Sequence, residues 1–351
     1  MRSNKGLFIG AILVVLVLGL TTVWSTAPDL FFTQLEFVIA GAIIVFLLSR
    51  FDTRSFFSIS TFLYFFSLFL LVLTMFIGKN IRGSVRWIDL GFFNLQTSEL
   101  VKPFLAIFYS TYLAKNKLTK WKDFIKFLLI SFIPVVIVAI QPDLGSALTL
   151  ACLPLALLIF TGHIKRLLII GLIGAAIAFP LAPKILKPYQ MQRLETFINP
   201  YSDPQGAGYN VIQATIAVGS GGLFGKGVKL GTQSHLNFLP ERHTDFIFAS
   251  FTEEFGLVGA GFLLLSYFVI FSTCLSAARE IRDKRSSLLS LSVFSIFIFQ
   301  TVVNVGMNLG VMPVTGITLP LFSYGGSSLL SFAILIGLQL RQLDLITPFE
   351  I

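Results

Sequence analysis

Near its start the chain reads Gly6-Leu-Phe-Ile-Gly-Ala-Ile-Leu-Val-Val-Leu-Val-Leu-Gly-Leu-Thr-Thr-Val-Trp-Ser25, a run without a charged side chain. A helix of about 20 mainly apolar residues is long enough to cross the hydrocarbon core of a bilayer. Comparable runs recur along the sequence, 55% of the 351 residues are hydrophobic, and the mean hydropathy is +0.85. These properties predict an all-α integral membrane protein.

Windows with few charges predict about ten transmembrane helices. The expected spans are residues 6–25, 34–49, 55–78, 98–114, 124–140, 144–161, 167–183, 255–277, 287–306 and 321–340. Because no small-residue cleavage site follows the first run, we expect a retained helix there rather than a signal peptide. No repeat of roughly 20–50 residues and no polar linker divides the chain, so we expect a single membrane domain over residues 1–351.

The Lys and Arg residues set the expected orientation, because cationic loops resist translocation and stay in the cytoplasm. With the N-terminus inside, the inner segments hold most of them, including Arg50, Lys117 and Lys165. This placement accounts for most of the +9 net charge, so the charge does not predict a nucleic-acid partner. Cys152 and Cys274 lie within expected spans, and their number and placement give neither a disulfide framework nor a Cys/His metal pattern.

Residues 184–254 form one long external loop between the seventh and eighth expected spans, and loops of this length usually carry function. The loop contains an apolar helical stretch at residues 211–218 and turn signals such as Asn199-Pro200 and Gly219-Ser-Gly-Gly222. We expect short helices along the membrane surface that partly re-enter it. The glycine-rich residues 219–227 differ from a phosphate-binding loop, since no Ser or Thr follows Lys226, and a tight turn between surface helices is the better interpretation.

The densest group of charges is Leu239-Pro-Glu-Arg-His-Thr-Asp245, in a chain where only 12% of residues are charged. Since an apolar helix follows, Thr244 or Asp245 could simply cap that helix. Alternatively, the Asp245 carboxylate could act as a general base at the mouth of an apolar cavity, with its pKa raised by burial or held by Arg242 and His243. A His and two carboxylates could also bind a divalent cation, although their spacing selects no particular geometry.

Charged residues within or beside the expected spans are further candidates, because such groups are costly in a membrane unless they are paired or hydrated. Glu99 and Lys102 stand three residues apart on one helix face and can pair, either as a structural ion pair or within a binding site. Asp143 could cap the helix that follows it. In an outer loop, Arg82 and Arg86 could bind lipid phosphates or act as solvated anchors at the interface.

Four blocks of the sequence, spread over most of the chain, agree with one family pattern. They are Arg86-Trp87 with Gln96-Thr-Ser-Glu-Leu-Val-Lys102; Gln141-Pro-Asp-Leu-Gly-Ser146; Leu239-Pro-Glu-Arg-His-Thr-Asp-Phe-Ile-Phe248 with Glu253-Glu-Phe-Gly256; and Gly316-Ile-Thr-Leu-Pro-Leu-Phe-Ser-Tyr-Gly-Gly-Ser-Ser328. The pattern resembles the SEDS family (shape, elongation, division and sporulation; FtsW, RodA and SpoVE), and the Glu-Arg-His-Thr-Asp form is closest to the RodA group. Ten spans with a large external loop between the seventh and eighth are that family's topology. The chain departs from the family at residues 250–252, where Ser-Phe-Thr replaces smaller residues, and this bulk could alter the width of the cavity.

The resemblance implies a peptidoglycan glycosyltransferase of the bacterial cytoplasmic membrane. Such a hexosyltransferase polymerises lipid II into glycan strands on the outer face, for cell elongation and shape. A glycan on undecaprenyl pyrophosphate would be the donor, and the 4-hydroxyl of the incoming disaccharide the acceptor. A class B penicillin-binding protein is the implied partner. No organic cofactor is expected, but Mg²⁺ or Mn²⁺ could assist.

The resemblance also implies roles for particular residues. Asp245 matches the family's essential aspartate, the proposed general base. The other expected contacts to substrate are Glu99, Lys102, Asp143, Gln213, Arg82, Arg86, Arg193, Arg242 and His243. The cations among them, or a divalent ion, would offset the charge of the leaving pyrophosphate. A lone carboxylate favours a single displacement with inversion.

Two other functions are alternatives to glycosyl transfer. A flippase for the same lipid would suit the charged pair Glu99 and Lys102 and the broken outer loop, but transporters usually show paired internal halves, which this sequence lacks. A non-catalytic scaffold for a penicillin-binding protein is the second alternative, and scaffolding is also compatible with catalysis.

Overall fold

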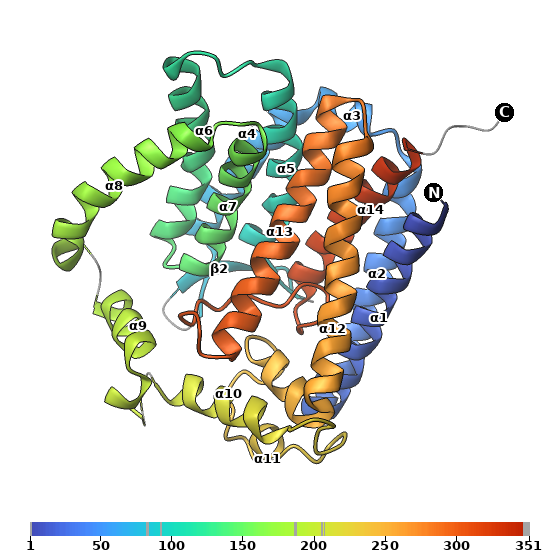
Figure 1. Ribbon diagram of the computed structural model, residues 1–351, viewed down its shortest axis with the longest axis vertical. Coiled ribbons are helices and arrows are strands. Elements are labelled where there is room, and N and C mark those ends of the chain that lie inside the picture. The colour runs from blue at the N-terminus through green and yellow to red at the C-terminus, as the bar shows by residue number, and fades with distance from the viewer. Residues whose placement is uncertain are drawn as a thin grey trace.

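The computed structural model describes residues 2–81, 84–91, 93–185, 188–204, 206 and 208–346. Long helices make up most of the molecule; most of them lie side by side, whereas the helix at residues 164–185 points away from the bundle (Figure 1). These are α1 (Arg2–Thr26), α2 (Phe31–Arg50), α4 (Ser60–Ile77), α5 (Thr97–Lys115), α6 (Trp121–Ile140), α7 (Leu144–Phe160), α8 (Ile164–Ile185), α12 (Ile247–Glu280), α13 (Lys284–Asn308) and α14 (Gly326–Asp344). The short helices are α3 (Thr53–Ser58), α9 (Pro188–Ile198), α10 (Tyr209–Ser220) and α11 (Thr232–His235), with 3₁₀ turns η1 (Pro28–Leu30) and η2 (Pro200–Ser202).

The helices confirm the predicted all-α membrane class. Within the described residues, seven helices are long and apolar enough to cross a membrane: α1, α2, α4, α6, α12, α13 and α14. Helix α7 is apolar but shorter, and the expected spans at 98–114 and 167–183 fall on α5 and α8, which are not among the seven. The ten expected stretches therefore fall on helices, while the number that cross the bilayer stays a prediction.

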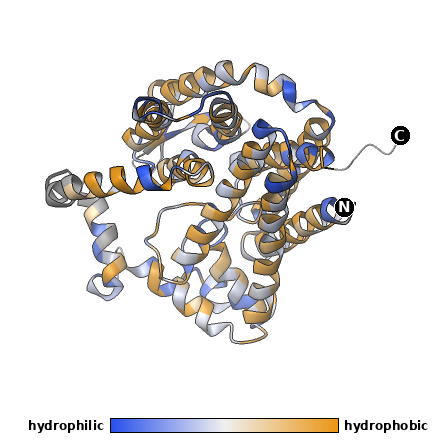
Figure 2. Cartoon of the chain, turned by 45° about the horizontal axis from the view of Figure 1, so that its top comes forward, coloured by the Kyte–Doolittle hydropathy of each residue, from blue (hydrophilic) through white to orange (hydrophobic). Residues whose placement is uncertain are grey.

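The centre of the bundle is formed by α13 and α14. In their most apolar windows 72% and 78% of the residues are buried, compared with 11% in α2. Helix α5 packs against both of them and is buried along most of its length. Hydrophobic residues line the helices and hydrophilic ones collect in the connections (Figure 2). Large side chains such as Phe76, which is 80% exposed, fit a surface that faces lipid.

Small residues allow α2 and α14 to pack closely. A Cβ on Gly41 would lie 2.9 Å from Leu329 Cδ2, and one on Gly337 would lie 2.7 Å from Leu48 Cβ. Where lipid removes most of the hydrophobic drive for association, close approach of this kind increases van der Waals contact between helices.

A three-stranded antiparallel sheet lies between α4 and α5. Its strands are β1 (Lys79–Ile81), β2 (Ser84–Asp89) and β3 (Asn94–Gln96), and Trp87 of β2 pairs with Gln96 of β3. The Lys79 side chain donates a hydrogen bond to Asp89 and holds the pKa of that carboxyl below its usual value. The sheet carries Arg86 and Gln96 to the start of α5.

The glycine-rich residues 219–227 pack on the first part of α12. A Cβ on Gly225, whose φ is +80°, would lie 2.1 Å from the Glu254 carbonyl oxygen. Conversely, a Cβ on Gly256, whose φ is +66°, would lie 2.3 Å from the Gly225 nitrogen. The predicted glycine turn is therefore confirmed, and its glycines allow two backbones to touch.

Candidate active site

Asp245 lies in the turn that precedes α12, and its main chain is held by two amides from α13. The side chains of Asn304 and Asn308 each donate to the Asp245 carbonyl oxygen at 3.0 Å. Asn304 also donates to Ile317 O at 2.7 Å, and Ala249 N donates to Asn308 Oδ1 at 2.9 Å. These bonds join the turn, the beginning of α12 and the segment after α13, so they fix the position of Asp245.

The expectation that Thr244 or Asp245 caps α12 is wrong. The N-cap residue is Phe246, which has no side-chain capping bond, and the helix begins at Ile247. The Thr244 hydroxyl instead donates back to Glu241 Oε2 at 3.1 Å. Packing explains the difference: Phe246 is 1% exposed and sits in an apolar cluster with α10, which aligns the start of the helix without a polar cap.

The segment between α13 and α14 brings Asp245 close to the hairpin that carries Asp143. A Cβ on Gly316, whose φ is +72°, would lie 3.5 Å from Asp245 Oδ2. The residue before it, Thr315, places its carbonyl oxygen only 2.4 Å from where a Cβ on Gly145 would lie. Thr315 is close to Gly145 of the Asp143 hairpin, and Gly316 is close to Asp245. Because Thr315 and Gly316 are consecutive, Asp245 and the hairpin both lie beside this segment.

Asp143 belongs to a polar group formed by three elements. Its carboxylate accepts a hydrogen bond from Ser146 N at 3.2 Å, so the predicted cap of α7 is confirmed. Arg86 Nη1 of β2 lies 3.4 Å from Asp143 Oδ1, and Gln96 Nε2 donates to Asp143 Oδ2 at 3.1 Å. Capping and an ion pair therefore coexist. Asp143 is 3% exposed, so Arg86 compensates a carboxylate that is largely removed from water.

Glu99 and Lys102 form the predicted ion pair on α5. Lys102 Nζ lies 2.6 Å from Glu99 Oε1 and 5.7 Å from the ring centroid of Phe332. Glu99 is 7% exposed and Lys102 is 1% exposed, and Glu99 Oε2 is buried without a hydrogen-bond partner. An unpaired oxygen on a buried carboxylate is costly, and it is the kind of group that a ligand or an ordered water satisfies.

Helix α14 joins this pair to the Asp143 group. Gln96 N donates to Ser327 Oγ at 2.9 Å, and Ser331 Oγ donates to Glu99 O at 2.7 Å. Gln96 therefore contacts Asp143 through its side chain and α14 through its backbone, just before the turn of α5 that carries Glu99. Residues 315–331 therefore contact the surroundings of Asp245, Asp143 and Glu99, although these three acids come from distant parts of the sequence.

The other expected residues are placed less centrally. Arg242 donates to Thr26 O at 2.9 Å and to Asn237 Oδ1, so its guanidinium ties the turn to the end of α1. The His243 ring packs edge-on against Tyr324, with centroids 5.7 Å apart. Gln213 is half-buried on α10, the helix whose Ala214 packs with Phe246. Arg82 and the side chain of Arg193 lie outside the described residues.

Two buried carboxylates that hold the outer loop were missed as structural residues. Glu253 Oε1 lies 2.8 Å from Lys226 Nζ, and its Oε2 accepts from Ser234 N at 3.1 Å. Glu254 Oε1 lies 2.9 Å from His235 Nε2 and also accepts from Ser25. Two adjacent acids inside an apolar helix were the available signal, since such charges need partners.

The two asparagines of α13 were also missed. Asn304 and Asn308 lie four residues apart near the end of α13, so both amides face the same side of the helix. That spacing was the signal in the sequence, but the groups they bind are backbone carbonyls, which no sequence pattern identifies.

The described residues offer no group of three or more His, Cys, Asp or Glu side chains that could hold a metal ion. Assistance by Mg²⁺ or Mn²⁺ therefore stays an expectation from the family resemblance, because such an ion would need further donors besides these side chains.

Comparisons with known proteins identify the family to which this sequence is similar. The family model of the FtsW, RodA and SpoVE cell cycle proteins matches residues 5–344. Peptidoglycan glycosyltransferase MrdB of Escherichia coli strain K12 is 35% identical over 324 residues, which cover 91% of this chain and 88% of MrdB. The probable peptidoglycan glycosyltransferase FtsW of Aliivibrio salmonicida is 35% identical over 298 residues, or 83% of this chain and 74% of that protein.

Solved structures share the fold. One match is a chain in a solved structure of a peptidoglycan synthase complex, described as showing the structural coordination of polymerization and crosslinking. Its TM-score is 0.84 at 34% sequence identity, and the match covers 96% of this chain and 97% of that chain. The rod shape determining protein RodA of Thermus thermophilus has a TM-score of 0.74 at 30% identity, with 97% of each chain covered. With its family model matched over nearly the whole length, this chain belongs to the FtsW, RodA and SpoVE family of cell cycle proteins, the SEDS family.

Proposed function

We propose that this chain is a peptidoglycan glycosyltransferase of the bacterial cytoplasmic membrane, which polymerises lipid II on the outer face. Relatives at 35% identity over most of both chains carry that activity in their names, and the apolar helices fit a multi-pass membrane enzyme. The observation that carries the proposal is the position of Asp245, held through its carbonyl by Asn304 and Asn308.

In the proposed mechanism Asp245 acts as the general base. Its carboxylate takes the proton of the acceptor 4-hydroxyl while that oxygen attacks the anomeric carbon of the donor glycan. The bond from this carbon to the undecaprenyl pyrophosphate breaks, and the pyrophosphate leaves with the bonding electrons. A single displacement inverts the anomeric centre. Rigid hydrogen bonding of the Asp245 backbone supports this role, since a base must be held within reach of its proton.

Arg86 and Lys102 are the proposed partners of the donor pyrophosphate. Both already face a carboxylate, Asp143 at 3.4 Å and Glu99 at 2.6 Å, which keeps the cations in place when no substrate is bound. Fixed charges in a site that excludes water stabilise a developing negative charge without reorganisation. Arg242 is a weaker candidate, because its guanidinium binds Thr26 O and Asn237.

The test is polymerisation of lipid II by the purified chain, alone and with a class B penicillin-binding protein as the proposed partner. Glycan polymer should form from lipid II, and the partner should increase the yield. Omitting divalent cations and adding EDTA tests the proposed assistance by Mg²⁺ or Mn²⁺ in the same assay. Lipid scrambling in vesicles without any polymer would favour the flippase, and no activity in either assay would favour the scaffold.

A further inference from the structure

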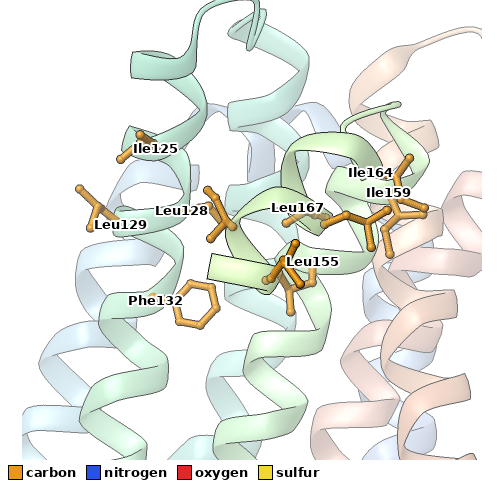
Figure 3. Close-up of a pocket in the computed structure, with 12 residues that line it drawn as sticks. Ile125, Leu128, Leu129, Phe132, Leu155, Ile159, Ile164 and Leu167 are labelled. Atoms are coloured by element: carbon orange, nitrogen blue, oxygen red, sulfur yellow. The ribbon is translucent and has the colours of Figure 1, made fainter. Parts of the chain in front are cut away.

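Two adjoining hollows lie at the end of the bundle that the Lys and Arg residues assign to the cytoplasm. The larger has a volume of about 1110 Å³ and lies between α6, α7 and α8 (Figure 3). Apart from Gly171, the residues lining it are Ile, Leu and Phe, among them Leu128, Phe132 and Leu155. Binding pockets for small molecules usually measure roughly 300–1,000 Å³, so this hollow has room for a flexible apolar chain.

The second hollow is cationic. It has a volume of about 810 Å³ and is lined by the α5–α6 and α7–α8 connections and by the start of α13. Lys117, Lys165, Arg166 and Lys284 line it, and no Asp or Glu does. Three separate connections therefore bring positive charge to one concave site.

The two hollows meet at residues 159–167. Ile159 and Ile164 line the apolar hollow, whereas Phe160 and Lys165 line the cationic one. Because neighbours in sequence alternate between the two, they share a wall. A molecule with an anionic head and an apolar tail would match this pair of surfaces.

The lysines are the cations available for a ligand. Arg166 already donates to Leu118 O at 2.5 Å and to Thr119 O at 2.6 Å, so its guanidinium holds the connection in shape. Lys117, Lys165 and Lys284 are exposed and have no ion pair with any described residue.

Asp283, which precedes Lys284 in the sequence, binds its own helix rather than a lysine of the hollow. The Asp283 carboxylate accepts bonds from Ser286 N at 3.0 Å and Ser286 Oγ at 2.8 Å, which caps α13. The positive-inside rule explains why lysines lie on this side of the membrane. It does not explain their convergence on a hollow that continues into an apolar one.

Basic pockets between transmembrane helices on the cytoplasmic side bind anionic lipid headgroups. We propose that this site binds an anionic glycerophospholipid of the cytoplasmic leaflet. The headgroup phosphate lies among Lys117, Lys165 and Lys284, and an acyl chain occupies the hollow between α6, α7 and α8. This binding is independent of the proposed chemistry at Asp245.

Native mass spectrometry of the full chain with phosphatidylglycerol or phosphatidylcholine tests the headgroup contact. The protein should retain phosphatidylglycerol preferentially, and the Lys117→Gln/Lys165→Gln/Lys284→Gln variant should lose about fivefold in this preference for each lysine removed. The matched control is Lys115→Gln/Lys120→Gln/Lys122→Gln, which removes the same charge from residues outside both hollows. Equal losses in the two variants would overturn the proposal, because they would reflect surface charge alone.

A second pair of variants tests whether an acyl chain occupies the apolar hollow between α6, α7 and α8. Gly171 and Gly174 lie on α8, and a Cβ at either meets no atom within 4 Å, but only Gly171 lines the apolar hollow. Gly171→Trp should reduce retention of phosphatidylglycerol severalfold, and Gly174→Trp should not. Unchanged retention in Gly171→Trp, or complete displacement of the lipid by millimolar inorganic phosphate, would contradict a lipid ligand.

Discussion

Asp245 is positioned through its backbone. Amides from Asn304 and Asn308 converge on its carbonyl oxygen, and Gly316 lies beside its carboxylate. In this arrangement the peptide group of Asp245 binds α13, and its carboxylate lies beside the segment that also contacts the Asp143 hairpin. A base held in this way keeps its position when its carboxylate gains or loses a proton.

Replacing Asn304 with Ala should destabilise the protein and slow polymerisation together. The change leaves Ile317 O without its donor and removes one of two donors to Asp245 O, and each unpaired buried acceptor costs about 1–3 kcal/mol. Thermal unfolding and polymerisation of lipid II measure the two effects. Gln300→Ala is the control on the same helix, since the Gln300 Oε1 atom is buried without a partner. Equal effects of the two substitutions would argue against the positioning role.

Lys102→Met should lower the free energy of unfolding more than the double substitution of both members of its ion pair does. The single change leaves the Glu99 carboxylate buried and unpaired, at a cost of about 3–5 kcal/mol, whereas Glu99→Leu/Lys102→Met removes both charges. Thermal unfolding should show this order. We expect the double variant to polymerise lipid II more slowly than the wild type, because the pyrophosphate loses one of its two proposed cations. Full activity of a stable double variant would make the pair purely structural.

At the scale of elements, the outer loop and α12 interlock through glycines. Gly225 and Gly256 let the two backbones touch, and the buried carboxylates of Glu253 and Glu254 bind the loop that follows. The loop is therefore fastened to the same helix whose first residues follow Asp245.

Gly256→Ala should loosen this interlock. The new methyl group would meet Gly225 N at 2.3 Å, and the backbone of Gly256, with φ +66° and ψ −167°, alone costs a residue with a Cβ about 1–3 kcal/mol. Thermal unfolding should occur at a lower temperature, and proteases should cut residues 225–235 faster. Gly261→Ala is the matched control on α12, because a Cβ there meets no atom within 4 Å. If both variants resist proteolysis like the wild type, the glycine contact does not hold the loop.

The sequence predicts helices well where apolar runs are long, and less well where side chains reorganise the backbone. The last expected span, 321–340, starts too early, because α14 begins at Gly326. Residues 321–325 look like helix by hydropathy, but the Ser323 hydroxyl accepts from Leu319 N and donates to Thr244 O. The small sheet escaped prediction for a related reason, since its strands of three to six residues gain their order from pairing with one another.

Local spacing predicts individual residues of the candidate site, whereas only the family resemblance implies that Glu99, Lys102, Asp143 and Gln213 lie in or near one cavity with Asp245. The Asp143 cap and the Glu99–Lys102 pair follow from local spacing, so the sequence was sufficient for them. Their connection to Asp245 runs through residues 315–331, by contacts of carbonyl oxygens and glycines that have no signature in composition. Such long-range contacts depend on how the helices pack, which local patterns do not determine.

At the scale of the whole molecule, the proposed base Asp245 and the proposed pyrophosphate partners Arg86 and Lys102 lie among helices that expose large apolar side chains. Substrates with long lipid tails can reach such a site without leaving the membrane. The proposed lipid site at the cytoplasmic end lies on other helices, α6 to α8, so the two ends of the bundle would serve different ligands.

The most direct test of the account is polymerisation of lipid II by an Asp245→Asn variant. Asparagine keeps the size of the side chain and leaves the carbonyl that binds Asn304 and Asn308, so folding and thermal stability should stay close to those of the wild type. Loss of a general base should slow polymerisation about 10²–10⁴-fold. Polymerisation at the wild-type rate by this variant would contradict the assignment of Asp245 as the base.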